Sequence, residues 1–341
     1  MRLIKDCTYL LPIRRASFSV TEAAGLAEYF RTLKDAGCDV LVLDGSPVPV
    51  FQQHHDAWHS FCRHEQVDRS FGYLNDKVNA IHTGVSLASL EKIVLADDDI
   101  RYTPPQIDRV CELLDEFEVV RPQNFLSPLP WWARMEAARM LINRATLRIA
   151  DYPGTCAFRR ATMLRVGHYD GDVLFDNEEI IRHFARGGAA IRYATNLFVR
   201  KKPPSLKKWI EQRPRQAYED FGLRAKTALF FSLPPLAMLF IFAAGWKGIM
   251  LFASALIVTA IALAAAGRRR GKAAQCFPWS VCLFAPLWVA ERALSTYWAL
   301  YWRLTRGGYP FGDKILSKGI GRDWVSGGKI AAASVARQSN E

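Results

Sequence analysis

Three consecutive aspartates, Asp97, Asp98 and Asp99, are the feature of this sequence best suited to chemistry. They follow an apolar run at residues 93–96 that is typical of a buried strand. Because side chains alternate along an extended chain, Asp97 and Asp99 share one side and can approach one cation. Carboxylates are ligands that Mg²⁺ and Mn²⁺ prefer, and such ions neutralise phosphate oxygens. We therefore take Asp97 and Asp99 as candidate ligands for Mg²⁺ or Mn²⁺, with a solvated acidic turn as the alternative.

The segments around this triplet predict an open α/β sheet. Apolar runs at 8–13, 39–43 and 92–96 indicate strands, and helical spacing at 23–36 and 79–90 indicates helices between them. In such sheets ligands bind at the carboxyl ends of the strands, where Asp44 and the aspartate triplet would lie. Further along, we expect helices at 105–116, at 131–148 and from the acidic cluster 176–179 to 186, and strands at 119–120 and 191–199.

Charge divides the chain into two parts. Residues 224–341 carry fifteen Lys or Arg and four Asp or Glu, whereas residues 1–223 carry thirty and twenty-nine. The uncharged stretches 227–244 and 248–267 have the length of membrane-spanning helices, with a turn at 245–247 between them. A basic cluster at 268–272 follows, so the positive-inside rule places it and the front domain in the cytoplasm. Two buried core helices of a soluble protein are the alternative, and a uniformly basic nucleic-acid-binding protein is disfavoured.

The expected organisation has four parts. Residues 276–302 are aromatic and carry Glu291 and Arg292 near their middle, and a charge at midspan costs about 2.5–3.5 kcal/mol. This segment is therefore expected to lie in or re-enter the interface rather than to span the bilayer. The parts are a cytoplasmic domain at 1–223 with an interfacial helix near 205–222, two transmembrane helices at 224–267, a basic and interfacial segment at 268–325, and a disordered tail at 326–341. The protein would be integral to the inner or plasma membrane.

Cysteine and histidine give weaker signals. The seven cysteines include no CxxC pair, which favours a reducing compartment over a disulfide or zinc framework. Four histidines gather at His54, His55, His59 and His64. Without a CxxC or a flanking carboxylate motif, we interpret them as solvated or capping residues rather than as a metal site.

The order of the polar motifs resembles that of the family 2 glycosyltransferases in their membrane-anchored form, over about residues 7–225. The matching features are Asp44 after its strand, the stretch Lys77 to Gly84, the aspartate triplet, Ala157-Phe158-Arg159-Arg160, the acidic cluster 176–179, and Gln212 with Arg215 before the first apolar stretch. The resemblance implies an open mixed sheet of the nucleotide-diphospho-sugar transferase type. It also implies a nucleoside-diphosphate sugar donor and transfer with inversion.

The resemblance also assigns roles to residues. Asp44 would bind the nucleobase, Lys77 and Asn79 the donor, and Asp98 the ribose, with Asp97 and Asp99 at the metal. Arg159 would lie on the acceptor side, and Gln212 and Arg215 would hold the diphosphate and the acceptor at the membrane. A turn aspartate, a surface lysine and an interfacial amphipathic helix are the respective alternatives for Asp44, for Lys77 and for the segment around Gln212.

The catalytic base departs from the family pattern. Inverting transfer needs a carboxylate to deprotonate the attacking hydroxyl, but the family's aspartate falls on Asn177, which cannot act as a base. A shift of one residue favours Glu178, followed by Asp176 and Glu179, although carboxylates also stabilise a helix start without catalysing anything. Gln216 replaces the tryptophan that processive family members carry.

Three functions remain open at this point. The first is transfer of one sugar to a membrane lipid or lipid-linked acceptor at the cytoplasmic face. The second is a processive polysaccharide synthase of the same fold. The third is a catalytically degenerate, membrane-bound scaffold, which the asparagine at position 177 supports.

Overall fold

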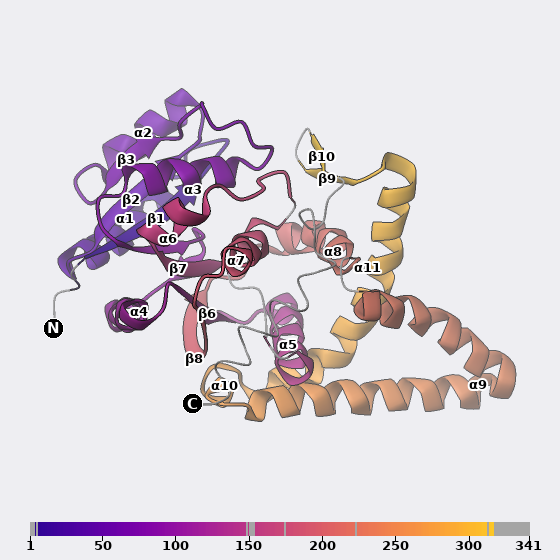
Figure 1. Cartoon of the computed structure of the whole chain (residues 1–341). Helices are drawn as coiled ribbons and strands as arrows, with labels where there is room; N and C mark the ends of the chain where they lie inside the picture. Colours follow the sequence, from indigo (N-terminus) through magenta and orange to yellow (C-terminus); the bar gives the residue numbers. More distant parts are fainter. Residues whose placement is uncertain are drawn as a thin grey trace. The chain divides into compact units, whose positions relative to one another are not determined.

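The computed structural model describes residues 4, 6–147, 149, 154–173, 175–221, 224–311 and 314–316 (Figure 1). Within these residues the chain forms two compact units. Unit 1 comprises the described parts of Met1–Asn124 and Tyr152–Arg200, and unit 2 those of Phe125–Asp151 and Lys201–Ile320. The expected front domain at 1–223 is thus divided, because residues 125–151 and 201–223 group with the apolar helices. The tail expected at 326–341 lies outside the described residues.

An eight-stranded mixed sheet, with the order β3-β2-β1-β4-β7-β6-β8-β5, is the frame of unit 1. Neighbours among β3, β2, β1 and β4 are parallel, whereas β7 is antiparallel to both β4 and β6. This confirms the predicted α/β class with an open mixed sheet. The strands are β1 (Cys7–Ile13), β2 (Asp39–Asp44), β3 (Arg63–Gln66), β4 (Lys92–Ala96), β5 (Ile100–Arg101), β6 (Val119–Leu126), β7 (Thr155–Arg159) and β8 (Ile191–Lys201).

Helices cover both faces of this sheet, so β1 is buried along its whole length. Tyr9 and Leu11 point into one apolar cluster with Phe30 of α1, while Leu10 points into the other with Ile81 of α3. This alternation is the two-residue period of a strand buried on both sides. The helices are α1 (Val20–Asp35), α2 (Val48–Trp58), α3 (Asp76–Leu87), α4 (Pro104–Glu116), α6 (Arg160–Val166) and α7 (Asp176–Arg186).

Among the elements that were not predicted are α2 and β3. The strand β3 has the sequence Arg63-His64-Glu65-Gln66, and only His64 is buried in it. An apolar period therefore cannot reveal this strand, and only pairing with β2 defines it.

Unit 2 is mainly helical. Among the described residues, α9 is the one helix long and apolar enough to cross a membrane, and 17% of its most apolar window is buried. That low burial disfavours the alternative of a buried core helix. The elements are α5 (Trp131–Thr146), α8 (Leu206–Asp220), α9 (Arg224–Arg269), α10 (Ala273–Cys276), the 3₁₀ helix η1 (Trp279–Phe284), α11 (Ala285–Arg306), β9 (Tyr309–Phe311) and β10 (Lys314–Leu316).

The long helix α9 is broken at Ala244 and Gly245, whose backbone angles are not helical. Figure 1 shows two arms that meet at a corner. Gly245 has φ +57°, a left-handed conformation that glycine adopts without a steric penalty. Near the corner the rings of Phe240 and Phe252 have centroids 5.6 Å apart. The break begins at the predicted turn, and a hairpin that spans a bilayer stays a prediction.

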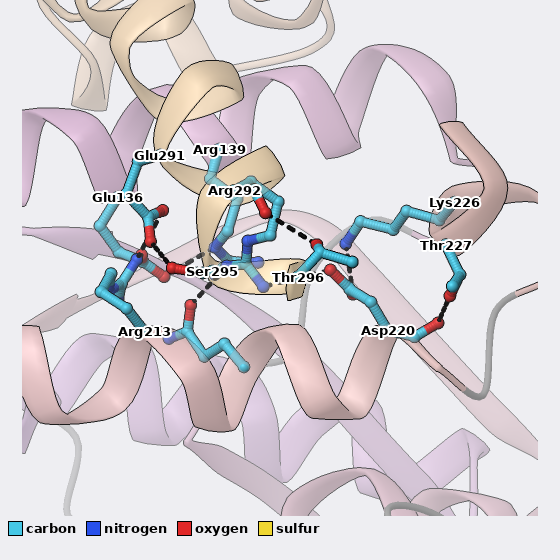
Figure 2. A network of polar contacts seen from close by, with 11 residues as sticks. Glu136, Arg139, Arg213, Asp220, Lys226, Thr227, Glu291, Arg292, Ser295 and Thr296 are labelled. Carbon is cyan, nitrogen blue, oxygen red and sulfur yellow. Dashed lines mark hydrogen bonds and ion pairs between the residues drawn. The ribbon is translucent and has the colours of Figure 1, made fainter. Parts of the chain in front are cut away.

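Charged side chains fill the interior of unit 2 (Figure 2). Arg292 of α11 is 1% exposed and donates hydrogen bonds to Asp220 at 3.1 Å and to Gln216 at 2.9 Å. Lys226 lies 2.8 Å from the same Asp220 carboxylate. Glu136 of α5 accepts hydrogen bonds from Arg139 at 2.6 Å and from Arg213 of α8 at 3.1 Å. The charge at position 292 is therefore paired inside the protein, as a buried ion requires.

The packing of α3 on the sheet generates a stability prediction. A Cβ on Gly84 would lie 2.9 Å from Leu10 Cδ2 and 3.0 Å from Leu43 Cδ2, and both leucines are fully buried. Gly84→Ala should therefore lower the free energy of unfolding by about 1–3 kcal/mol, because a filled core cannot accept the methyl group. Gly25→Ala in α1 is the matched control, since nothing lies within 4 Å of its Cβ. The control should be neutral or stabilising by up to about 1 kcal/mol. Unfolding of both purified variants in detergent measures the difference, and equal midpoints would contradict the packing.

Candidate functional site

Three parallel strands of unit 1 end at one edge of the sheet. Ile13 at the end of β1 pairs in register with Asp44 at the end of β2, and β4 ends at Ala96, directly before the aspartate triplet. Because parallel strands share their direction, the residues that follow them meet at this carboxyl edge. Polar side chains expected there from sequence alone are thus on the same side of the sheet.

Lys77 connects the aspartate triplet to the acidic start of α7. Its Nζ lies 2.5 Å from Asp97 Oδ1, 2.6 Å from Asp176 Oδ2 and 2.7 Å from Asn177 Oδ1. The amide of Asn177 donates a hydrogen bond to Asp97 Oδ2 at 3.2 Å. Burial lowers the pKa of Lys77, but the carboxylates of Asp176 and Asp97 raise it more, so the net pKa lies above the ordinary value. We call Lys77, Asp97, Asp176 and Asn177 the lysine–aspartate cluster.

Arginine residues complete the carboxyl edge, and these were not singled out from the sequence. Arg15, just after β1, forms an ion pair with Asp98, and its backbone N–H donates to Ser46 Oγ at 2.8 Å. Arg14 forms an ion pair with Asp76 at the start of α3. In the sequence, these two arginines could have been found as a basic pair directly after the first strand. Ligand-binding residues of parallel sheets lie at such strand ends.

The residues fit a hard divalent cation. Asp97 and Asp99 are half-buried and offer only carboxylate oxygens, the ligand type that Mg²⁺ and Mn²⁺ take. The ammonium group of Lys77 already lies between Asp97 and Asp176, which shows that these carboxylates attract positive charge. Asp99 is close to this group in sequence, and its role as a ligand remains a prediction.

The three candidate base residues at the start of α7 have different surroundings. The side chain of Glu179 is 1% exposed and pairs with Arg182 at 3.4 Å and with Arg186. Asp176 belongs to the lysine–aspartate cluster. Glu178 accepts a hydrogen bond from Arg121 at 2.8 Å and has the most exposed carboxylate of the three, at 13% against 10% for Asp176.

The structure corrects the interpretation of two histidines. His54 and His64 are buried rather than solvated, and both contact Asp44 Oδ2, at 2.7 Å from His54 Nδ1 and 3.1 Å from His64 Nε2. The other oxygen, Oδ1, accepts the Ser46 N–H at 2.8 Å. Burial raises the pKa of Asp44, but these hydrogen bonds lower it more, so the net pKa lies well below the ordinary value. Both oxygens of the predicted nucleobase contact are therefore engaged within unit 1.

Two predicted donor or acceptor contacts hold the fold instead. The side-chain amide of Asn79 accepts a hydrogen bond from the backbone N–H of Tyr73 and donates one to its carbonyl, at 3.0 Å each. These two bonds fix the loop before α3. Arg159 pairs in register with Lys92, at the opposite end of β4 from the aspartate triplet. Its guanidinium donates to the carbonyls of Leu114 and Asp115 at 2.7 Å each. The antiparallel direction of β7 thus carries Arg159 to the edge opposite the aspartate triplet, and its acceptor-side role stays a prediction.

The remaining predicted residues, Gln212 and Arg215, lie on α8 in unit 2 and are half-buried. Their neighbour Arg213 is 3% exposed and binds Glu136, and Gln216 accepts from Arg292. Gln216, which stands where processive family members carry tryptophan, therefore has a structural partner in this chain.

No family model matches the chain, and no curated protein matches its sequence. Solved structures do match. The mannosyltransferase PcManGT from Pyrobaculum calidifontis, in complex with GDP-Man and Mn²⁺, is 17% identical with a TM-score of 0.46, over 86% of this chain and 87% of that one. Glucosyl-3-phosphoglycerate synthase from Mycobacterium tuberculosis, in complex with Mn²⁺ and UDP-glucose, is 17% identical with a TM-score of 0.42, over 59% and 73%. Another complex of that synthase holds Mg²⁺ and UDP.

The lysine–aspartate cluster generates a prediction about charge. Lys77→Met should lower the free energy of unfolding by about 1–3 kcal/mol, because the carboxylates of Asp97 and Asp176 lose their cation. Added Mn²⁺ should restore part of that loss, since a cation again lies between acidic groups. Lys92→Met is the matched control, because its partner Asp115 has a side chain 66% exposed at the other edge of the sheet. Thermal unfolding with and without Mn²⁺ measures both effects, and equal losses in the two variants would contradict the cluster's role.

Proposed function

We propose that this chain is a metal-dependent glycosyltransferase that moves a sugar, with inversion, from a nucleoside-diphosphate sugar to a membrane lipid or lipid-linked acceptor at the cytoplasmic face. The observation that carries the proposal is the lysine–aspartate cluster at the carboxyl edge of the parallel strands. Lys77, Asp97 and Asp176 are distant in sequence, and each comes from a different motif of the resemblance. Three motifs that meet in one cluster support a common site better than their order alone.

The charges at this edge suit a nucleoside diphosphate. Asp97 and Asp99 would hold Mg²⁺ or Mn²⁺, which when bound supplies charge neutralisation to the diphosphate leaving group. The guanidinium groups of Arg14 and Arg15 follow β1 at the same edge and can contact phosphate oxygens. Lys77 lies between the metal-ligand candidate and α7, so its ammonium can hold the donor while Asp176 fixes its position.

Glu178 is proposed as the base. Asp176 shares Lys77 with Asp97, and the Glu179 side chain is only 1% exposed. Glu178 has Arg121 and Arg182 beside it, but its side chain is the most exposed of the three, at 13%, so a substrate can reach it most readily. It would take the proton of the acceptor hydroxyl as that oxygen bonds to the anomeric carbon and the bond from this carbon to the diphosphate breaks. Arg121 orients the carboxylate from β6.

The membrane part of the proposal rests on unit 2. The helix α9 has the length and composition of a membrane crossing, and its arms meet at Ala244 and Gly245. Basic residues follow at Arg268 and Arg269, which favours the cytoplasm for this end by the positive-inside rule. A protein with such a helix would lie at the membrane, where its substrate can be an acceptor anchored in the bilayer. Single transfer is favoured over a processive synthase because Gln216 is committed to Arg292.

A donor screen tests the reaction. The purified full chain in detergent, given nucleoside-diphosphate sugars with a lipid extract, should release nucleoside diphosphate with Mn²⁺ and not with a chelator. Asp97→Asn combined with Asp99→Asn should lower this release by about a hundredfold or more, because the charge that develops on the diphosphate loses its stabilisation. Asp115→Asn makes the same chemical change at the opposite edge and should have no effect. Unchanged turnover in the double variant would exclude this site for the metal.

The identity of the base is tested separately. Glu178→Gln should lower kcat by about 10²–10⁴-fold while donor binding, measured by thermal shift, is retained, because only proton transfer is lost. Glu179→Gln, on the same helix turn, should reduce stability through its arginine partners while the folded fraction keeps its turnover. Full activity of Glu178→Gln together with an inactive Asp176→Asn would transfer the role to Asp176.

A further inference from the structure

A second set of ligating side chains lies around the end of β2. Asp44, His54 and His64 are all buried, and their ligand atoms lie within 4.8 Å of one another. They come from three elements, since Asp44 ends β2, His54 lies within α2 and His64 belongs to β3. We call these residues the Asp–His–His triad. The proposed sugar transfer does not need them as a group.

Neighbouring rings fix both imidazoles. His54 stacks on Trp58 with ring centroids 4.3 Å apart, and His64 stacks on Phe51 at 4.4 Å. On its outer side, His64 Nδ1 faces His55 Nδ1 at 3.4 Å. A histidine that binds a metal through one nitrogen usually has a polar partner at the other, and His55 supplies this partner. The ligand atoms are thus held in place before any ion binds.

The charge of Asp44 distinguishes it from the other carboxylates at this edge. Its side chain is 0% exposed, yet within the described part of the chain it has no Lys or Arg partner. Asp97, Asp98 and Glu178 each have one. Buried charges in proteins are paired or coordinate metal ions. A divalent cation would compensate the charge of the buried carboxylate.

We propose that the Asp–His–His triad is a zinc-binding site that ties β2, α2 and β3 together. Zinc takes imidazole nitrogen and carboxylate oxygen at about 2.0–2.2 Å, so tetrahedral ligand atoms lie about 3.3 Å apart. The distances from Asp44 Oδ2, 2.7 Å to His54 Nδ1 and 3.1 Å to His64 Nε2, need only a small outward movement. Zinc would take the place of the two ring N–H groups that face Asp44 Oδ2, so each bound ring would carry its proton on the outer nitrogen instead. Imidazole ligands favour Zn²⁺ over Mg²⁺ and Mn²⁺, which separates this site from Asp97 and Asp99.

Metal binding to the full-length protein in detergent tests this site. The chain, stripped with a chelator and carrying Asp97→Asn and Asp99→Asn to remove the other candidate site, is titrated with Zn²⁺ against a chromogenic chelator. One equivalent should bind and should raise the thermal unfolding midpoint. His54→Gln and His64→Gln should each weaken zinc binding by about a hundredfold or more. Such a loss exceeds the one expected when only the hydrogen-bond partner of a metal ligand is removed. His59→Gln is the matched control, because His59 is exposed and caps α2.

The unmutated triad gives a second readout that does not depend on variants folding. Co²⁺ substituted for Zn²⁺ should give the visible absorption of a four-coordinate nitrogen and oxygen site, and X-ray absorption of the zinc form should show two imidazoles. Absence of binding, binding that survives His64→Gln, or binding lost in His59→Gln would each overturn the proposal. Absence of sugar transfer by the chain with Asp97 and Asp99 unchanged, together with intact zinc binding, would refute the proposed function alone.

Discussion

Balance of negative charge at one edge of the sheet is the constraint on which unit 1 depends. The parallel strands and the start of α7 bring Asp97, Asp98 and Asp176 to or beside the carboxyl edge, where all are partly buried. Each is held by a basic side chain from a different element, Lys77 of α3 for two of them and Arg15 after β1 for the third. Leaving a charge in such a place unpaired costs several kcal/mol, a large part of the net stability of a domain. The ion pairs therefore fix the ends of β1, β4, α3 and α7 together.

Unit 2 follows the same rule with other elements. Arg292 lies within an aromatic, apolar helix, and Asp220 and Gln216 of α8 accept hydrogen bonds from its two terminal nitrogens (Figure 2). Lys226 adds a second positive charge to Asp220. Charged side chains within apolar helices are expensive unless they face the protein interior and pair there. These ion pairs and hydrogen bonds fix how α8, α9 and α11 align with one another. Apolar contacts are non-directional and do not specify that alignment.

Much of the fold could be predicted from local patterns in the sequence. The apolar strands β1, β2 and β4, the acidic residues that follow β4, and the break in the long apolar helix can all be read from neighbouring residues in the sequence. Which charged and polar side chains pair cannot be read from the local sequence, because Arg15 and Asp98 are 83 positions apart and Lys77 and Asn177 are 100 apart. His64 lies in a polar strand that only pairing with β2 defines, so its burial was hidden. Arg159 matched a family motif, yet the direction of β7 carries it to the far edge. Motif order thus supplied a list of candidate residues, and sheet topology decides which of them meet.

Asn177 shows how a neutral side chain can take part in a cluster of charged residues. Its amide does two things at once, since its oxygen accepts a hydrogen bond from Lys77 and its nitrogen donates one to Asp97. An aspartate there could accept from Lys77 but could not donate, and its carboxylate would face that of Asp97 at hydrogen-bond distance. Like charges so close raise the pKa of one of them and weaken the grip on a shared cation. With Lys77 already serving two carboxylates, a third at position 177 would leave the cluster with excess negative charge. A neutral amide orients Asp97 and bonds to Lys77 without adding a negative charge, and Glu178, the next residue in the chain, is the carboxylate that we propose as the proton acceptor.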